Sequence, residues 1–179
     1  MKYANFFVFF LFISQKNSNF VAEIRVYMEK NTEIERKFLV CSDRFKSQSV
    51  RHYAIKQGYL CKEAGKTIRV RIRDDKAFLT IKSSLLRKGL AKFEWEQEIS
   101  ADDARELMQL CLPGVITKTR YIIPCTQEGR KWEVDVFEGR LAGLVLAEIE
   151  LGSEDESFEH PEWLGEEVTG QPQYYNANM

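Results

Sequence analysis

Charged residues recur at every second position along most of this chain. In a β-strand, residues i and i+2 point to the same face of the sheet, so a strand with this spacing has one charged face. The residues between the charges are apolar, as Val70 and Ile72 are among three arginines. The polar and charged sets are Glu33, Glu35 and Lys37; Arg69, Arg71 and Arg73; Thr80 and Lys82; Glu94, Glu96 and Glu98; Lys118 and Arg120; Glu133 and Asp135; and Glu148 and Glu150. This spacing predicts amphipathic β-strands, and most of their charged faces carry a single sign.

Eight segments with this period-two pattern are separated by turn-forming residues. They are residues 33–40, 54–60, 67–73, 77–83, 92–99, 117–123, 131–137 and 145–151. One helix is expected from residue 100 to about 111, because Ser100-Ala-Asp-Asp103 resembles a capping box. Two short helices are expected to begin at Ser153 and Pro161. We therefore expect a mainly β (α+β) fold, a closed antiparallel eight-stranded β-barrel with a few flanking helices.

The charged faces of such a barrel could point outward or inward. A half-solvated antiparallel sheet accounts for any single strand of this kind. Like charges that share a face repel, so a solvated surface would more often mix the two signs. The single-signed faces therefore favour a charged interior. Desolvating each charge costs on the order of several kcal/mol, so we expect an open, hydrated tunnel that holds a charged ligand.

The two kinds of charge predict what the tunnel would hold. Guanidinium and ammonium groups bind phosphate oxygens. Clustered carboxylates bind hard divalent cations such as Mg²⁺ or Mn²⁺, and the carboxylate pairs of the first and last strands would meet across a closed barrel. Both together predict a metal–polyphosphate complex.

The composition argues against several other classes of protein. The 179 residues suffice for one domain, and 26 basic and 27 acidic residues leave a net charge of −1. This balance argues against a nucleic acid or a membrane surface as the partner. Four scattered cysteines and two histidines show no zinc-ligand spacing. We expect reduced, mostly buried thiols and a cytoplasmic protein.

Residues 1–27 differ from the rest of the chain. Residues 6–13 (FFVFFLFI) form an apolar run that is too short to cross a bilayer, which needs about 20 residues. No clear cleavage site follows it. We expect initiation at Met28, with residues 1–27 as an over-extension of the start site and residues 28–179 as the single functional domain. A secretory signal is the alternative.

A series of motifs resembles a known family. It begins with Glu33-Ile34-Glu35-Arg36-Lys37, an ExExK pattern in the first strand. It continues in order with QGYL at 57–60, RVRIR at 69–73, LTIK at 79–82, EWE at 94–96, KTR at 118–120, WEVD at 132–135, EIE at 148–150, EVTG at 167–170 and YYN at 174–176. From residue 32 onward the chain therefore resembles the CYTH superfamily, the triphosphate tunnel metalloenzymes, and most of all its short bacterial branch. The resemblance implies metal-dependent hydrolysis of inorganic triphosphate (tripolyphosphate), with nucleoside and thiamine triphosphates as further candidate substrates.

The resemblance also implies roles, position by position. It implies metal binding by Glu33, Glu35, Asp135, Glu148 and Glu150. It implies triphosphate binding by Lys37, Arg69, Arg71, Lys82, Lys118 and Arg120, with Lys82, Glu35 and Arg120 as the catalytic residues. Glu94 and Glu96 would orient basic residues or hold a second metal. Glu98 is expected to be structural, and Arg73 would form an ion pair at the rim or touch the substrate.

The expected reaction is in-line attack of water on a terminal phosphorus, without a side-chain nucleophile. Two other functions remain open: a class IV adenylate cyclase, which would form cyclic AMP and pyrophosphate from ATP, and a non-catalytic polyphosphate-binding module. The sequence does not distinguish among the triphosphate substrates, nor between Mg²⁺ and Mn²⁺. Outward apolar faces are compatible with a homodimer.

Overall fold

The computed structural model describes residues 31–85, 89–127 and 129–179. Residues 33–179 form one compact unit, and residues 1–32 form a separate one, of which residues 31 and 32 are described. The expectations for residues 1–27, and the boundary at Met28, lie outside the described residues.

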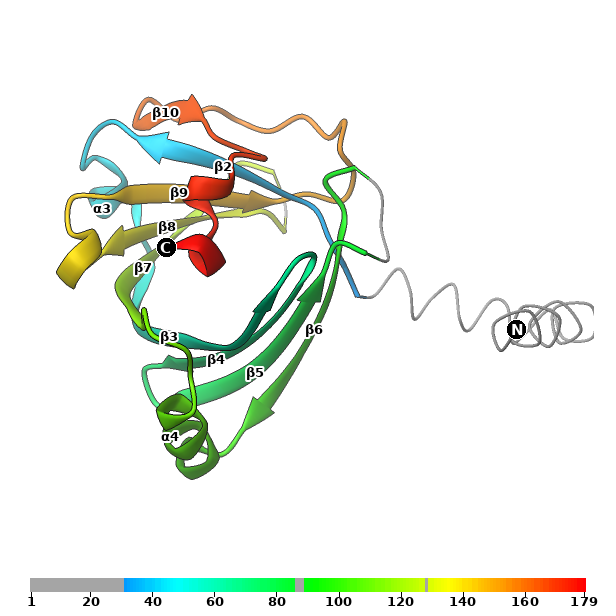
Figure 1. Ribbon diagram of the computed structural model, residues 1–179. Coiled ribbons are helices and arrows are strands. Elements are labelled where there is room, and N and C mark those ends of the chain that lie inside the picture. Colours follow the sequence, from blue (N-terminus) through cyan, green and yellow to red (C-terminus); the bar gives the residue numbers. More distant parts are fainter. Residues whose placement is uncertain (1–30, 86–88, 128) are drawn as a thin grey trace, which may run out of the picture. The chain divides into compact units, whose positions relative to one another are not determined.

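In the described part of the chain, ten strands form a single sheet (Figure 1). They are β1 (Thr32–Glu33), β2 (Glu35–Val40), β3 (Arg51–Glu63), β4 (Lys66–Arg73), β5 (Lys76–Ser83), β6 (Lys92–Ile99), β7 (Ile116–Pro124), β8 (Lys131–Phe137), β9 (Val145–Glu150) and β10 (Leu164–Glu167). Their order in the sheet is β1-β6-β5-β4-β3-β7-β8-β9-β2-β10. The pairings from β6 to β10 in this order are antiparallel. The predicted antiparallel β architecture is confirmed.

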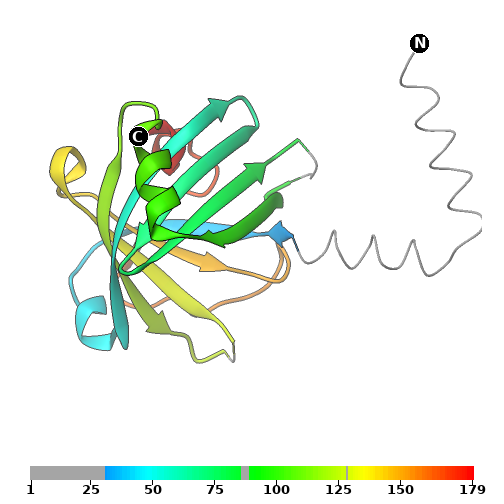
Figure 2. The same ribbon diagram turned by 90° about the horizontal axis from the view of Figure 1, so that it is seen from below.

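The prediction of a closed eight-stranded barrel is wrong. The order runs from β1 at one edge to β10 at the other, and among the described residues no ladder joins these edges. The residue Ile34 separates β1, which pairs with β6, from β2, which pairs with β9 and β10. Because β10 lies along Phe38 and Val40, it occupies the edge of β2 that a closed barrel would offer to β6. Between β6 and β2, the wall of the strongly curved sheet is therefore joined by the backbone that links β1 to β2 and not by a ladder of hydrogen bonds (Figures 1 and 2).

Helix α4 (Ala101–Gln109) confirms the helix predicted after residue 100. Its cap is Ser100, whose hydroxyl accepts a hydrogen bond from the backbone N–H of Asp103 at 3.0 Å. The helix lies across the outer side of β3, β4 and β5 (Figures 1 and 2). There Ala104 packs against Val70 and Ala77, so the apolar outer face of these strands is covered.

The prediction of helices that begin at Ser153 and Pro161 is wrong. Residues 153–160 contain no helix, and the chain then forms β10. The carboxylate of Glu156 accepts a hydrogen bond from the backbone N–H of Gly152 at 2.6 Å and pairs with Arg130 at 2.7 Å. These contacts hold the segment in a turn. The other short elements are α3 (Phe45–Gln48), η1 (Gly139–Leu141), η2 (Pro172–Tyr174) and η3 (Asn176–Asn178).

Apolar side chains cover the outer side of β2, β7, β8 and β9. The ring of Trp132 lies 5.7 Å from the rings of both Phe38 and Trp163, and Phe45 of α3 belongs to the same cluster. All four side chains are buried. The main core of the protein therefore lies outside the curved sheet, where the chain covers its own outward apolar faces.

A second apolar cluster lies on the inner face of the same strands, beyond the charged residues. Its buried members are Ile116, Phe137, Leu146 and Val168, and Met179 at the C-terminus packs against them. Ile116, Phe137 and Leu146 each lie two positions from a charged residue of β7, β8 or β9, so they share the face of the charged residues. This end of the interior is therefore apolar.

Two further observations concern the helices and the cysteines. None of the helices in the described residues has the length and apolar character of a membrane span. All four cysteines are free thiols. Cys41 is exposed and the other three are half-buried, so the expectation of mostly buried thiols is wrong.

The packing of α4 against β3 predicts the effect of one substitution. A Cβ added to Gly58 would lie 2.6 Å from Sγ of Cys111 and 3.0 Å from Sδ of Met108, just after and within α4. We predict that Gly58→Ala lowers the free energy of unfolding by about 1–3 kcal/mol, the usual cost of overpacking. Urea denaturation measures it, and adding Cys111→Ala should restore part of the loss. Unchanged stability of Gly58→Ala would contradict this packing.

Candidate active site

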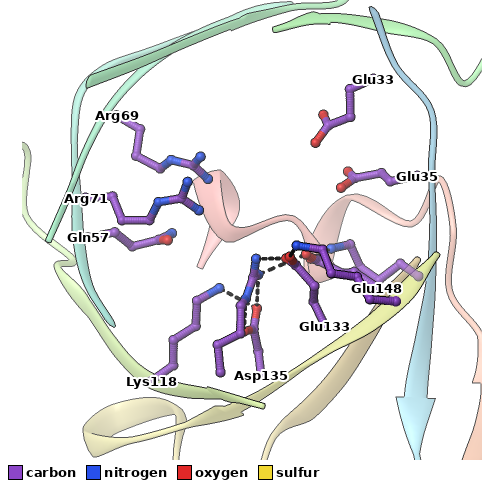
Figure 3. Close-up of polar contacts among 12 residues, drawn as sticks. Glu33, Glu35, Gln57, Arg69, Arg71, Lys118, Glu133, Asp135 and Glu148 are labelled. Atoms are coloured by element: carbon purple, nitrogen blue, oxygen red, sulfur yellow. Dashed lines mark hydrogen bonds and ion pairs between the residues drawn. The ribbon is translucent and has the colours of Figure 1, made fainter. Parts of the chain in front are cut away.

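The inner face of the sheet encloses a cavity of about 850 Å³. Among the described residues, ten basic and eight acidic side chains line it, so neither sign dominates. Figure 3 shows Arg69 and Arg71 on one wall facing Glu33 and Glu35 on the other. The charged faces of the strands thus point inward, and the alternative of a solvated charged exterior is wrong.

The deepest charged group is a buried triad on β7 and β8. The guanidinium of Arg120 donates two hydrogen bonds to Asp135, from Nε to Oδ1 and from Nη2 to Oδ2, each of 2.6 Å. The ammonium of Lys118 also binds Oδ2 of Asp135 (Figure 3). Asp135 is fully buried, and both of its oxygens are thus occupied. Of the three residues, Arg120 lines the cavity, whereas Lys118 and Asp135 lie behind its wall.

Burial and pairing set the charges of this triad. Burial alone would raise the pKa of Asp135, but the charges of Arg120 and Lys118 outweigh it and lower that pKa. Burial lowers the pKa of Lys118 to about 8, although the charge of Asp135 opposes the shift. The carboxylate is therefore held ionised by two cations.

A second group joins β2, β8 and β9. The ammonium of Lys37 forms an ion pair with Glu148, its direct cross-strand neighbour. Arg120 reaches the other oxygen of Glu148 at 3.1 Å and also pairs with Glu133. Burial would raise the pKa of Glu148, but Lys37 and Arg120 keep it well below its ordinary value. This carboxylate is ionised and shared between two cations.

A third group joins β1, β5 and β6. The ammonium of Lys82 lies 2.6 Å from Oε2 of Glu33 and 3.1 Å from Oε2 of Glu94. Burial raises the pKa of Glu33 to about 8, with help from the charges of Glu35 and Glu94 and against that of Lys82. Burial is therefore the main reason that the carboxyl of Glu33 holds its proton more tightly, although Lys82 lies beside it.

Two arginines of β4 form the facing wall. Nη2 of Arg71 donates to Glu96 at 2.8 Å, and Nη2 of Arg69 donates to Oγ1 of Thr80 at 3.2 Å. The buried Nε atoms of both arginines have no hydrogen-bond partner in the described part of the chain. Burial, and then the charge of Arg69, lower the pKa of Arg71 to about 10. Unpaired buried donors of like charge are suited to an anion.

The last pair of acids lies on β2 and β9. Glu35 and Glu150 are direct cross-strand neighbours that both line the cavity. Burial would raise the pKa of Glu35, but Lys82 and Lys37 lower it to about 2. Burial and the charges of Glu94 and Glu133 raise the pKa of Glu150. An ionised carboxylate thus lies opposite one for which Lys131 and Lys82 only partly offset burial and the nearby acids.

These carboxylates fit a hard divalent cation by their chemistry. Glu33, Glu35 and Glu150 offer carboxylate oxygens from adjoining strands, and a cation between such neighbouring carboxylates would stabilise them. In the described residues, however, no three acidic, histidine or cysteine side chains converge as a ready-made metal cluster. The ammonium of Lys82 binds both oxygens of Glu33 instead, and that of Lys92 binds Oε1 of Glu35.

Part of the cavity lining carries no role assigned from the sequence. Lys92 lines the cavity and shares a face with Glu94, so the alternation rule alone could have assigned it. Glu133 also lines the cavity, and the sequence placed it on the charged face with Asp135 but gave it no role. Tyr175 and Asn176 also line the cavity, but they follow a 3₁₀ turn, where no periodic signal exists.

Two residues at the periphery were also considered in the sequence. Glu98 pairs with Lys76 at 3.1 Å and does not line the cavity, which agrees with a structural role. Arg73 lines the cavity, with its guanidinium 5.0 Å from the ring centre of Tyr53 and 4.7 Å from that of Phe78.

Comparison with known proteins places the chain among relatives of matching length. It is 43% identical over 148 residues to an inorganic triphosphatase of Acetivibrio thermocellus, covering 82% of this chain and 92% of that protein. It is 37% identical over 153 residues to an inorganic triphosphatase of Nitrosomonas europaea, covering 83% and 96%.

A solved structure and a family model agree with these relatives. The crystal structure of an inorganic triphosphatase superposes with a TM-score of 0.59 at 34% identity, over 82% of this chain and 92% of that one. The model of the CYTH domain matches residues 31–178. With its inward-facing acids and bases on a curved antiparallel sheet, this chain belongs to the CYTH domain family.

Proposed function

We propose that this protein hydrolyses inorganic triphosphate with the help of a divalent cation. The observation that carries the proposal is the lining of one cavity by paired basic and acidic side chains from most strands of the sheet. Relatives at 43% and 37% identity are named inorganic triphosphatases, which supports the same reaction here. A triphosphate chain carries several negative charges, so it needs many basic contacts and a cation to balance it.

The basic residues would bind the phosphates. Arg69 and Arg71 supply unpaired buried N–H groups from one wall, and Lys37, Lys82 and Arg120 supply charge from the others. Because charge spreads over the transferred phosphoryl group and the leaving group, fixed cations on several sides stabilise the transition state. Lys82 touches two carboxylates and Arg120 touches three, so we assign them to the terminal phosphoryl group.

The acidic residues divide into two groups. We propose Glu33, Glu35, Glu148 and Glu150 as ligands of Mg²⁺ or Mn²⁺, which would neutralise phosphate charge and polarise the attacking water. A pKa of about 2 makes Glu35 a poor general base, which supports its assignment to cation binding. Glu94 and Glu96 hold Lys82 and the two arginines in place.

Asp135 has a different role in this proposal from the one the family resemblance implies. Both of its oxygens accept hydrogen bonds from Arg120 and Lys118, and it does not line the cavity. We propose that Asp135 positions Arg120 for the phosphates. Lys118 then acts through Asp135 instead of touching the substrate.

The alternatives make distinct predictions. A cyclase needs a site for the base and ribose of ATP, and no observation favours one. A non-catalytic binding module would bind triphosphate without releasing phosphate.

We propose a cytoplasmic location, because four free cysteines suit a reducing compartment. We also propose that the protein has no nucleic-acid or membrane partner. A homodimer stays a proposal, with exposed Val50, Leu110 and Leu112 as apolar side chains available for contact.

The reaction can be tested with a panel of substrates. We predict that phosphate is released from tripolyphosphate with Mg²⁺ or Mn²⁺, and that excess EDTA abolishes release because the carboxylates then hold only lysines and arginines. Phosphate release from tripolyphosphate, ATP and thiamine triphosphate, each with Mg²⁺, Mn²⁺ or Ca²⁺, measures this. Products of ATP are to be separated, since ADP with phosphate indicates hydrolysis. Triphosphate binding without phosphate release in every metal, or cyclic AMP from ATP, would contradict the proposal.

The different roles proposed for Glu35 and Asp135 can be tested by a matched pair of substitutions. We predict that Glu35→Gln weakens Mn²⁺ binding by about tenfold or more, the loss expected for a metal-site residue. Asp135→Asn should leave Mn²⁺ affinity unchanged but lower kcat/KM for tripolyphosphate by about 100-fold, because Arg120 is no longer fixed. It should also cost about 3–5 kcal/mol of stability, because it unbalances a buried ion pair.

Electron paramagnetic resonance of Mn²⁺ gives the affinities for this pair, and urea denaturation gives the stabilities. If Asp135→Asn weakens Mn²⁺ binding as much as Glu35→Gln does, Asp135 is a metal ligand as the family resemblance implies. The role proposed above would then be wrong.

A further inference from the structure

Lys92 is a cavity residue to which no role has been given so far. It is the first residue of β6, and its side chain is 23% exposed. Its Nζ donates a hydrogen bond to Oε1 of Glu35 at 2.8 Å and lies 4.8 Å from the ring centre of Tyr175. All three residues line the cavity. The lysine therefore joins β6, β2 and the C-terminal segment.

The ion pair of Lys92 lies where the sheet is interrupted. In the strand order β6 neighbours β1 and β5, whereas β2 neighbours β9 and β10, so no backbone ladder holds β6 to Glu35. The hydrogen bond from Lys92 to Glu35 spans this interruption. A side-chain contact can exchange its partner without breaking a backbone ladder, so this contact can change on binding while the strand pairings stay intact.

Each member of this ion pair could also bind a different partner. Glu35 has Glu150 as its direct cross-strand neighbour and Glu33 two residues before it, so its carboxylate belongs to an acidic group. A divalent cation at this group would compete with the single charge of Lys92 for the same oxygen. An ammonium has three N–H donors, and Lys92 uses one of them on Glu35, so it can also bind phosphate oxygens.

We propose that Lys92 is a further substrate-binding residue, paired with Glu35 in the free protein and transferred to a phosphate oxygen when Glu35 binds a cation. The inference rests on the proposed function. The face of Tyr175 keeps the ammonium at the cavity wall by a cation–π contact while it exchanges partners. Lys92 thus neutralises the acidic group when the site is empty and the substrate when it is filled.

This exchange has a signature that a purely structural role lacks. Removing the ammonium should strengthen cation binding, because a competitor for the oxygen of Glu35 is lost. The same change should weaken substrate binding, because a charged contact to phosphate is lost. A lysine that only braces the wall would, when removed, weaken both or neither.

The test uses the full chain with Lys92→Met, which keeps the length of the side chain, and Lys92→Arg, which keeps the charge. The matched control is Lys46→Met, because Lys46 forms an ion pair of the same 2.8 Å with Asp43, outside the cavity. Mn²⁺ binding is measured by electron paramagnetic resonance without any phosphate present. KM and kcat for tripolyphosphate are measured separately, and thermal unfolding confirms that each variant is folded.

We expect Lys92→Met to bind Mn²⁺ several-fold more tightly than the parent and to raise KM about tenfold, the loss of one charge-assisted hydrogen bond, with a smaller change in kcat. Lys92→Arg should restore KM, and Lys46→Met should match the parent. Mn²⁺ binding by Lys92→Met that is equal to or weaker than that of the parent would overturn the inference, and so would undetectable Mn²⁺ binding in both proteins. Each of these results would leave the hydrolase proposal intact. Absence of tripolyphosphate hydrolysis by the parent would instead overturn the proposed function.

Discussion

Ion pairs inside the curved sheet are the interaction on which this structure depends. A charge moved from water into a protein interior costs several kcal/mol unless another charge compensates it. Here Asp135 is held by Arg120 and Lys118, and Glu148 by Lys37 and Arg120. The pairs let a charged interior exist in the free protein. They also leave each charge able to exchange its partner for a ligand, which is what a site for a cation and a polyanion requires.

Apolar packing elsewhere in the protein offsets the cost of this charged interior. Trp132, Trp163 and Phe38 lie on the outer side of the sheet, and burying each such side chain fully contributes roughly 1.5–3 kcal/mol. One end of the inner side is apolar, where Ile116 and Phe137 pack against the C-terminal residues. The sheet is therefore held from outside and from one end, and its middle is free to hold polar groups.

The sequence predicts much of this arrangement because strand faces follow a local rule. Alternation assigned Arg69, Arg71 and the glutamates to one face without knowledge of their neighbours, and it could have assigned Lys92. Alternation could not predict which residues of that face line the cavity. Lys118 and Asp135 share faces with Arg120 and Glu133, yet they lie behind the cavity wall. Strand register decides which residues reach the cavity. The prediction of a closed sheet was also wrong. Its outcome depends on β10 pairing with β2, a contact between residues more than 120 positions apart.

The central claim is that the paired acids and bases of the cavity jointly bind a cation and a triphosphate. Its most direct test is a crystal structure with Mn²⁺ and a non-hydrolysable imidotriphosphate, with the metal located by its anomalous scattering. We predict the triphosphate between Arg69, Arg71 and Lys82, with Mn²⁺ beside the carboxylates of β2 and β9. Triphosphate bound outside the sheet, with the ion pairs of the cavity unchanged, would contradict the account.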